Sequence, residues 1–174
     1  MATTTQSART ARARTLLAAL VKTRKADLEV DLALVAVRTA LAWIFIWYGS
    51  GKLFGSFNGP GIHVTSLFME NTAHLRPGGF FAVLGGVIEF GGAISIALGL
   101  GARLAGVALF GDMMMAMITT TWTNGITAEK IPPGYDFNVA LAALALVVAL
   151  VGAGRFSVDA LAERRVLAMG SRAG

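Results

Sequence analysis

The chain contains four long apolar stretches, separated by loops rich in glycine, proline and polar residues. These stretches cover residues 32–48, 80–98, 104–122 and 137–151. A helix that crosses a bilayer needs about 20 mostly apolar residues, so each stretch predicts one membrane-spanning helix, the last of them extended at its ends. We therefore expect an all-α membrane protein, built as an antiparallel bundle of four transmembrane helices.

The composition agrees with a single membrane domain. The chain has 174 residues, of which 55% are hydrophobic and 14% charged, which is too apolar for a soluble domain of this length. We divide it into a basic N-terminal segment at 1–31, a transmembrane domain at 32–154 and a basic tail at 155–174. The short apolar run 16–21 lies between basic residues, which predicts an interfacial helix and not a signal peptide.

Basic residues are distributed unevenly about the spans and give the chain a net charge of +5. Most of them precede the first span, follow the last one or, like Arg103, occupy the short turn between the second and third. Lys52, Arg76 and Lys130 lie on the other side of the membrane. The positive-inside rule therefore predicts a multi-pass protein with both termini in the cytoplasm. Topology and attraction to anionic lipid explain the basic excess, so we expect the bilayer as a partner and no nucleic acid.

The first outer loop, residues 49–79, is long for a compact domain. Val64 and Phe68 lie at a helical interval inside it, which predicts a short interfacial helix at the outer leaflet. His63 and His74 lie in the same loop. Their spacing matches no compact metal motif, so we expect no metal site.

Three of the apolar stretches each contain one ionisable residue at membrane depth: Arg38, Glu89 and Asp112. A charge in the hydrocarbon region costs about 2.5–3.5 kcal/mol, so such residues usually face the bundle interior and pair there. We expect these three to meet as a cluster that holds charge or protons. Two other interpretations stay open: Arg38 reaches the inner interface with its long side chain, or Arg38 and Glu89 form a purely structural clamp.

A second group of residues predicts a pocket near this cluster. Lys52 lies at the outer end of the first span on the same helical face as Arg38, where it either points inward or anchors the helix at the interface. Asp112 is followed by a methionine-rich run that includes Met115. Methionine packs adaptably and also lines greasy pockets, so Lys52, Glu89 and Met115 are candidates for a quinone or lipid site.

Charged residues and glycines form motifs in a specific order along the chain. Over residues 32–161 the motifs are Val37-Arg38, Gly49-x-x-Lys52-Leu53, Gly85-Gly86-x-x-Glu89-x-x-Gly92, Leu98-Gly99-Leu100 with Arg103, Gly134-Tyr135-Asp136, and Gly152-x-Gly154-Arg155-Phe156-Ser157-x-Asp159. Their order and spacing resemble the DoxX family. Arg38, Lys52 and Glu89 match family positions, whereas Asp112 has no place in the family pattern. Asp136 stands where many members have glutamate.

The resemblance implies a small four-helix protein of the bacterial plasma membrane. Related DoxD-type proteins are subunits of a thiosulfate:quinone oxidoreductase. Mycobacterial DoxX-type members are associated with a membrane oxidoreductase assembly that involves superoxide dismutase and a thiosulfate sulfurtransferase. The resemblance therefore implies soluble oxidoreductase partners and a role in oxidative-stress detoxification.

The chain has no cysteine, and none of its four apolar stretches contains a histidine. Thiol exchange, iron–sulfur clusters and a haem held between the spans are therefore excluded. Our leading hypothesis is a membrane subunit that anchors or couples a redox complex, with quinone as the candidate cofactor and electrons supplied by a partner. The alternatives are a proton-coupled small-molecule or lipid transporter, which would need a homo-oligomer because four spans are few for alternating access, and a purely structural scaffold.

Overall fold

The computed structural model describes residues 3–127 and 132–170, with side chains described for 27–127 and 132–164. Every regular element in these ranges is a helix, so the predicted all-α class is confirmed. The side chains of the run 16–21 lie outside the described part, and so do Lys130 and Arg172. The expectations attached to them stay predictions.

The chain divides into two compact units, Met1–Ala33 and Leu34–Gly174. Helix α1 (Thr3–Phe54) begins in the first unit and ends in the second. The other elements of the second unit are η1 (Ser56–Asn58), α2 (Gly61–Asn71), α3 (Gly78–Leu98), α4 (Ala102–Ala116), the π-helical turn η2 (Met117–Thr121), η3 (Trp122–Asn124), α5 (Asp136–Val151) and α6 (Val158–Gly170). The predicted boundaries at residues 31 and 154 are not tested by this division.

In the part of the chain that the structure describes, three helical segments are long and apolar enough to cross a membrane: Asp27–Phe54, Gly78–Leu98 and Ala102–Asn124. They correspond to the first three predicted spans. The fourth, α5, is apolar but has only 16 residues. The predicted short helix of the first loop also exists as α2, although its place at a membrane interface stays a prediction.

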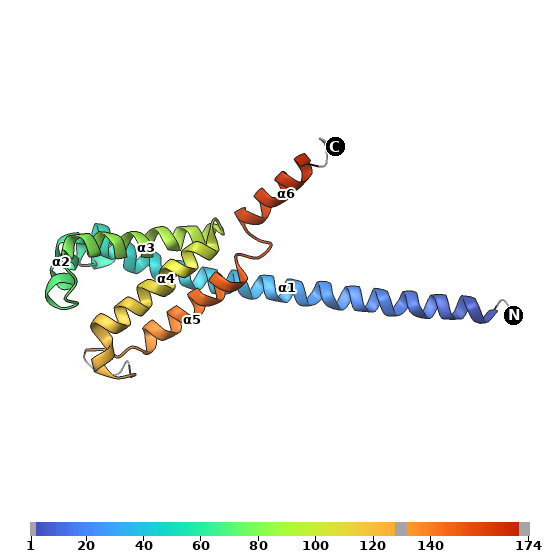
Figure 1. Cartoon of the computed structure of the whole chain (residues 1–174), viewed down its shortest axis with the longest axis horizontal. Helices are drawn as coiled ribbons and strands as arrows, with labels where there is room; N and C mark the ends of the chain where they lie inside the picture. Colours follow the sequence, from blue (N-terminus) through green and yellow to red (C-terminus); the bar gives the residue numbers. More distant parts are fainter. Residues whose placement is uncertain (1–2, 128–131, 171–174) are drawn as a thin grey trace. The chain divides into compact units, whose positions relative to one another are not determined.

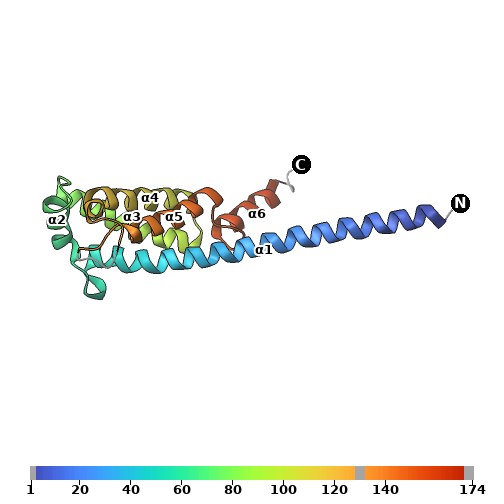
Figure 2. The ribbon, with the colours of Figure 1, turned by 90° about the horizontal axis from the view of Figure 1, so that it is seen from below.

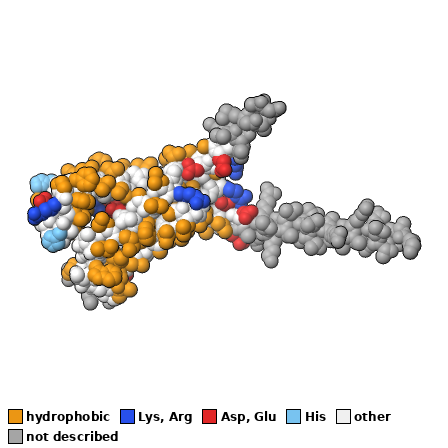
Figure 3. All heavy atoms as spheres, in the orientation of Figure 1, with side chains coloured by type: hydrophobic (Ala, Val, Ile, Leu, Met, Phe, Trp, Pro, Cys, Tyr) orange, Lys and Arg blue, Asp and Glu red, His pale blue; other side chains and the backbone are white. Residues whose placement is uncertain are grey.

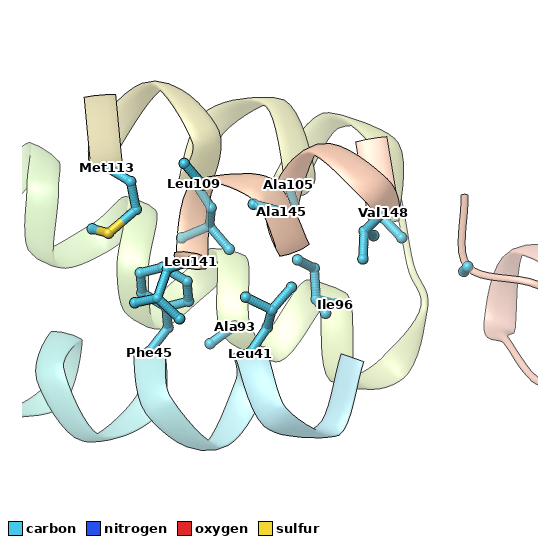
Figure 4. Packing of buried hydrophobic residues seen from close by; sticks show 13 residues of the cluster. Leu41, Phe45, Ala93, Ile96, Ala105, Leu109, Met113, Leu141, Ala145 and Val148 are labelled. Carbon is cyan, nitrogen blue, oxygen red and sulfur yellow. The ribbon is translucent and has the colours of Figure 1, made fainter. Parts of the chain in front are cut away.

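Helices α1, α3, α4 and α5 lie together in the second unit (Figure 2), and their buried side chains form one hydrophobic core (Figure 4). Its largest fully buried apolar side chains are Leu41 and Phe45 from α1, Ile96 from α3, Leu109 from α4 and Val148 from α5. The outer faces of these helices are apolar too, as Figure 3 shows for one side of the molecule. Leu104 is 77% exposed and Leu150 67% exposed, which is the surface expected of helices that face lipid.

Glycines let pairs of core helices approach backbone to backbone. A Cβ atom on Gly49 of α1 would lie 2.5 Å from the Phe90 nitrogen of α3, and one on Gly106 of α4 would lie 2.7 Å from the Ala149 nitrogen of α5. Small residues commonly allow such contacts between membrane helices. These glycines therefore set the spacing of α1 against α3 and of α4 against α5.

Helices α3 and α4 are joined by a tight turn and then move apart. Gly99 and Gly101 in the turn have φ values of 66° and 58°, a left-handed conformation that glycine adopts without a Cβ penalty. From this turn the two helices diverge toward their other ends (Figure 1). We call the end at residues 99–101 the turn end, and the opposite end, where α2 packs on α3, the loop end.

Candidate functional site

Arg38 is buried at the turn end, where its guanidinium binds only main-chain carbonyl groups in the bonds described. Its Nε donates to the Ile96 oxygen, Nη2 to the Ala97 oxygen, and Nη1 to the oxygens of Ala153 and Phe156, each at 2.8 Å. The first two carbonyls belong to the last turn of α3, and the other two follow α5. Helix ends leave such carbonyls without intrahelical partners. One side chain therefore holds α1, α3 and the segment after α5 together.

The structure does not bring Arg38 to Glu89 and Asp112. Ile96 follows Glu89 by seven residues on α3, which is about 10 Å along the helix axis. The physical reason for this departure from the expected cluster is competition: unsatisfied carbonyls lie closer to the guanidinium than the carboxylates do. The alternative of an Arg38–Glu89 clamp is not observed either.

The same end of the core accounts for the motif residues around Gly99 and Asp159. Asp159 Oδ1 accepts a hydrogen bond from the Gly101 nitrogen at 3.0 Å, and the Asp159 nitrogen donates to the Gly99 oxygen at 3.1 Å. Ser157 Oγ accepts from the Ala160 nitrogen at 3.2 Å, as an N-cap of α6 does. These contacts fasten the α3–α4 turn to the start of α6, so this group of motif residues is structural.

Lys52 and Glu89 form an ion pair between α1 and α3. Lys52 Nζ lies 2.6 Å from Glu89 Oε1, and the Glu89 side chain is only 2% exposed. Lys52 therefore points inward and does not serve as an interfacial anchor. A carboxylate buried at this depth is tolerated when a cation pairs with it, so Lys52 takes the part that the sequence suggested for Arg38.

Asp112 of α4 lies close to this pair. It is near enough to both Glu89 and Lys52 to interact electrostatically with them. Gly85 leaves room for it, because a Cβ there would lie 3.6 Å from Asp112 Oδ1. We call Lys52, Glu89 and Asp112 the acid cluster. With two carboxyl groups and one ammonium, it is electrically neutral when the two acids together hold one proton.

A cavity of about 740 Å³ lies beside the acid cluster. It is lined by residues of α1, α2, α3, α4, η2 and α5, most of them apolar, and all three members of the cluster line it. Met113 and Met115 form part of its wall. The structure thus brings Lys52, Glu89 and Met115 together as expected, adds Asp112 to them, and leaves Arg38 outside the cavity lining.

The cavity is partly open, and exposed residues of α1, α2, α3, α4 and α5 line it. Leu84 of α3 is 41% exposed, and Val107 and Met115 of α4 are 58% and 46% exposed, although all three line the cavity. Its mouth therefore lies on an apolar side surface. Figure 3 shows that hydrophobic side chains cover much of the surface of these helices.

Several polar residues near the loop end of the cavity were not expected from the sequence. Thr119 and Thr120 in the π-helical turn and Asn138 at the start of α5 all line it. Single π-helical turns occur frequently at functional sites. The available signal was the run of three threonines at the end of an apolar stretch, but no pattern in the sequence places Asn138 beside it.

The described residues contain no group of three or more His, Cys, Asp or Glu side chains that could hold a metal ion. His63 and His74 are both exposed. The donor set of the cavity, one ammonium and two carboxyl groups in apolar walls, suits a small organic molecule better than a metal ion.

Comparison with protein families gives one match, to the DoxX family model over residues 33–122. The match includes Arg38 and all three members of the acid cluster. Searches of curated proteins and of solved structures gave no significant match.

Proposed function

The chain belongs to the DoxX family of membrane proteins, and we propose that it is an integral membrane subunit whose cavity binds a small lipid-soluble molecule beside the acid cluster. One observation carries this proposal: a partly open, mostly apolar cavity of about 740 Å³ that is lined by a lysine paired with a buried glutamate. Ligand sites are typically about 300–1,000 Å³, mostly apolar, with a few convergent polar groups.

The proposed topology has four membrane-spanning helices in an antiparallel bundle, with α5 as the fourth. Leu141, Ala145 and Val148 on one face of α5 are buried in the same core as the other spans, while Val147 and Leu150 on the outer face are exposed and apolar. At 16 residues, α5 is about 24 Å long, and a modest thinning of the bilayer accommodates that length. Charge distribution supports both termini in the cytoplasm, with α2 at the outer interface. The family resemblance supports a bacterial plasma membrane.

A quinone is the candidate ligand because the residues present fit one. Methionine and aliphatic walls suit a flat ring, and Lys52 can donate a hydrogen bond to a carbonyl oxygen. Glu89 and Asp112 also line the cavity, and their carboxyl groups can hold a proton beside the ligand. When bound, a quinone would supply the two-electron redox chemistry that these side chains lack.

The wider role we propose is that of a subunit that anchors or couples a redox-detoxification complex. The family resemblance supports it, with soluble oxidoreductases such as superoxide dismutase or a sulfurtransferase as partners. The chain has no cysteine, so electrons would come from a partner and catalysis would belong to the complex.

Purified protein in lipid nanodiscs should bind a short-chain quinone, measured by quenching of its tryptophan fluorescence. We expect Glu89→Gln to weaken binding at least about tenfold, the effect of losing one strong charged contact, because the substituted amide no longer pairs with Lys52 and so no longer holds the ammonium that donates to the quinone carbonyl. Glu163→Gln is the matched control, since Glu163 is exposed on α6. If the wild type does not bind the quinone, a quinone is ruled out as the ligand. If Glu89→Gln binds it as tightly as the wild type does, the acid cluster is ruled out as the binding site.

A further inference from the structure

The acid cluster can accept more hydrogen bonds than its protein neighbours donate to it. Lys52 Nζ is bonded to Glu89 Oε1 at 2.6 Å. Glu89 Oε2 and Asp112 Oδ2 are both buried and receive no hydrogen bond from any protein group in the described part of the chain. Even when the two acids share one proton, each carboxyl oxygen has two acceptor positions, so most acceptor capacity stays unused.

Most neighbouring polar side chains that line the cavity are already committed elsewhere. The hydroxyl groups of Thr65, Thr119 and Thr120 donate to main-chain carbonyls one helical turn earlier, at 2.7, 2.8 and 2.6 Å. Asn138 directs its amide to the Met113 sulfur at 3.9 Å. Tyr48 carries the remaining hydroxyl of the lining, and its side chain is half exposed. The unused acceptors therefore belong to two residues that line a cavity whose walls offer few donors.

We propose that the cavity selects amphiphiles whose head group donates hydrogen bonds to Glu89 and Asp112, either a neutral hydroxyl or an ammonium group. This inference rests on the proposed function, because it specifies the class of molecule that the cavity binds. A hydroxyl oxygen can donate to a carboxyl oxygen and accept from Lys52 at the same time. An ether or ketone oxygen can only accept a hydrogen bond from Lys52 and has no hydrogen to donate to the carboxyl groups.

The same acid cluster rejects anionic head groups. A carboxylate has no hydrogen to donate, so it leaves the buried acceptors of Glu89 and Asp112 unpaired, and the single ammonium of Lys52 is already paired with Glu89. The apolar body of the ligand lies along the mouth formed by Leu84, Val107 and Met115. Fatty acids of the same length are therefore excluded, although their tails would fit.

Full-length protein in nanodiscs can be tested with four probes that share a decyl chain: a dihydroxybenzene, its dimethoxy derivative, decylamine and decanoate. We expect the dihydroxy probe to bind at least about tenfold more tightly than the dimethoxy probe, since one hydrogen bond to a charged group accounts for that ratio. Decanoate should not compete. Asp112→Asn should reduce the ratio of the affinities for the dihydroxy and dimethoxy probes, while the exposed control Glu163→Gln should leave that ratio unchanged.

Decylamine distinguishes the two kinds of head group that could donate, a hydroxyl and an ammonium. If the natural head group is an ammonium, decylamine binds more tightly than the dihydroxy probe and releases a proton to the buffer; if it is a hydroxyl, the order is reversed and no proton is released. Both results support a donor-selective site. Equal affinity for the dihydroxy and dimethoxy probes would overturn this inference alone. Failure of every probe, including a quinone, to bind would overturn the proposed function with it.

Discussion

Replacing Arg38 with methionine is expected to remove most of the folded protein. Four main-chain carbonyls at the turn end would lose their donor at once. An acceptor left unsatisfied in a buried place costs about 1–3 kcal/mol, so the combined loss is comparable with the whole stability of a small domain. Arg38→Lys should give a stability between those of the wild type and Arg38→Met. The lysine ammonium keeps the charge, but it lacks the planar guanidinium group that donates to four carbonyls.

Thermal unfolding in detergent and the monodisperse yield from size-exclusion chromatography measure this effect. Arg103→Met is the matched control: Arg103 is exposed and makes a single described hydrogen bond, to the Val151 oxygen at 3.2 Å. It should change the unfolding temperature little. An Arg38→Met protein as stable as the wild type would contradict the assignment of Arg38 to the helix ends.

Breaking the Lys52–Glu89 pair from one side should be strongly destabilising, whereas removing both partners should not. Lys52→Met leaves Glu89, at 2% exposure, without its cation. Removing one partner of a buried ion pair costs about 3–5 kcal/mol, and uptake of a proton by Glu89 would offset part of that. The double variant Lys52→Met/Glu89→Gln has no unpaired charge at these two positions, so it should lie within about 1–2 kcal/mol of the wild type.

Unfolding free energies of the two single variants and the double variant, measured in one detergent, give the coupling between the two side chains. The pair Arg76–Glu70 supplies the control, because it is 3.9 Å apart and its side chains are 77% and 46% exposed. Its coupling should be below about 1 kcal/mol. Additive effects at Lys52 and Glu89 would mean that the ion pair is not formed.

Much of this architecture follows from the sequence. Apolar length and composition predicted the three helical segments capable of spanning a membrane, and the helical interval of Val64 and Phe68 predicted α2. Membrane depth alone singled out Glu89 and Asp112, which do meet in the structure. For the methionine run the sequence left adaptable packing and a pocket wall open; Met113 packs in the core and Met115 lines the cavity.

The position of Arg38 could not be obtained in this way. Counting residues along the predicted helices shows only which side chains lie at the same membrane depth. The partners of Arg38 are instead main-chain carbonyl groups near the ends of α3 and α5, which have no intrahelical partner. Those ends meet only after the chain has folded. Helical depth also treats all spans as parallel rods, but α3 and α4 diverge from their turn (Figure 1). Residues of both helices line the cavity.

The third span departs from the single helix expected over 104–122. Regular α-helix ends at Ala116 and a π-helical turn follows. Thr119, Thr120 and Thr121 each bond back to the carbonyl four residues earlier, at 2.8, 2.6 and 3.5 Å. Hydroxyls that bond back in this way compete with the helix ladder and bend it. The hydropathy of the sequence does not show where an α-helix changes to a π-helical turn.

The central claim is that Glu89 and Asp112 lie together in a cavity that opens toward lipid. Dicyclohexylcarbodiimide, which enters bilayers and modifies protonated carboxyl groups, tests it most directly when the adduct is located by peptide mass spectrometry. We predict an adduct on Asp112 or Glu89, lost in Glu89→Gln/Asp112→Asn and reduced by a bound dihydroxy amphiphile. Labelling confined to other carboxyl groups, with Glu89 and Asp112 unmodified, would contradict the account.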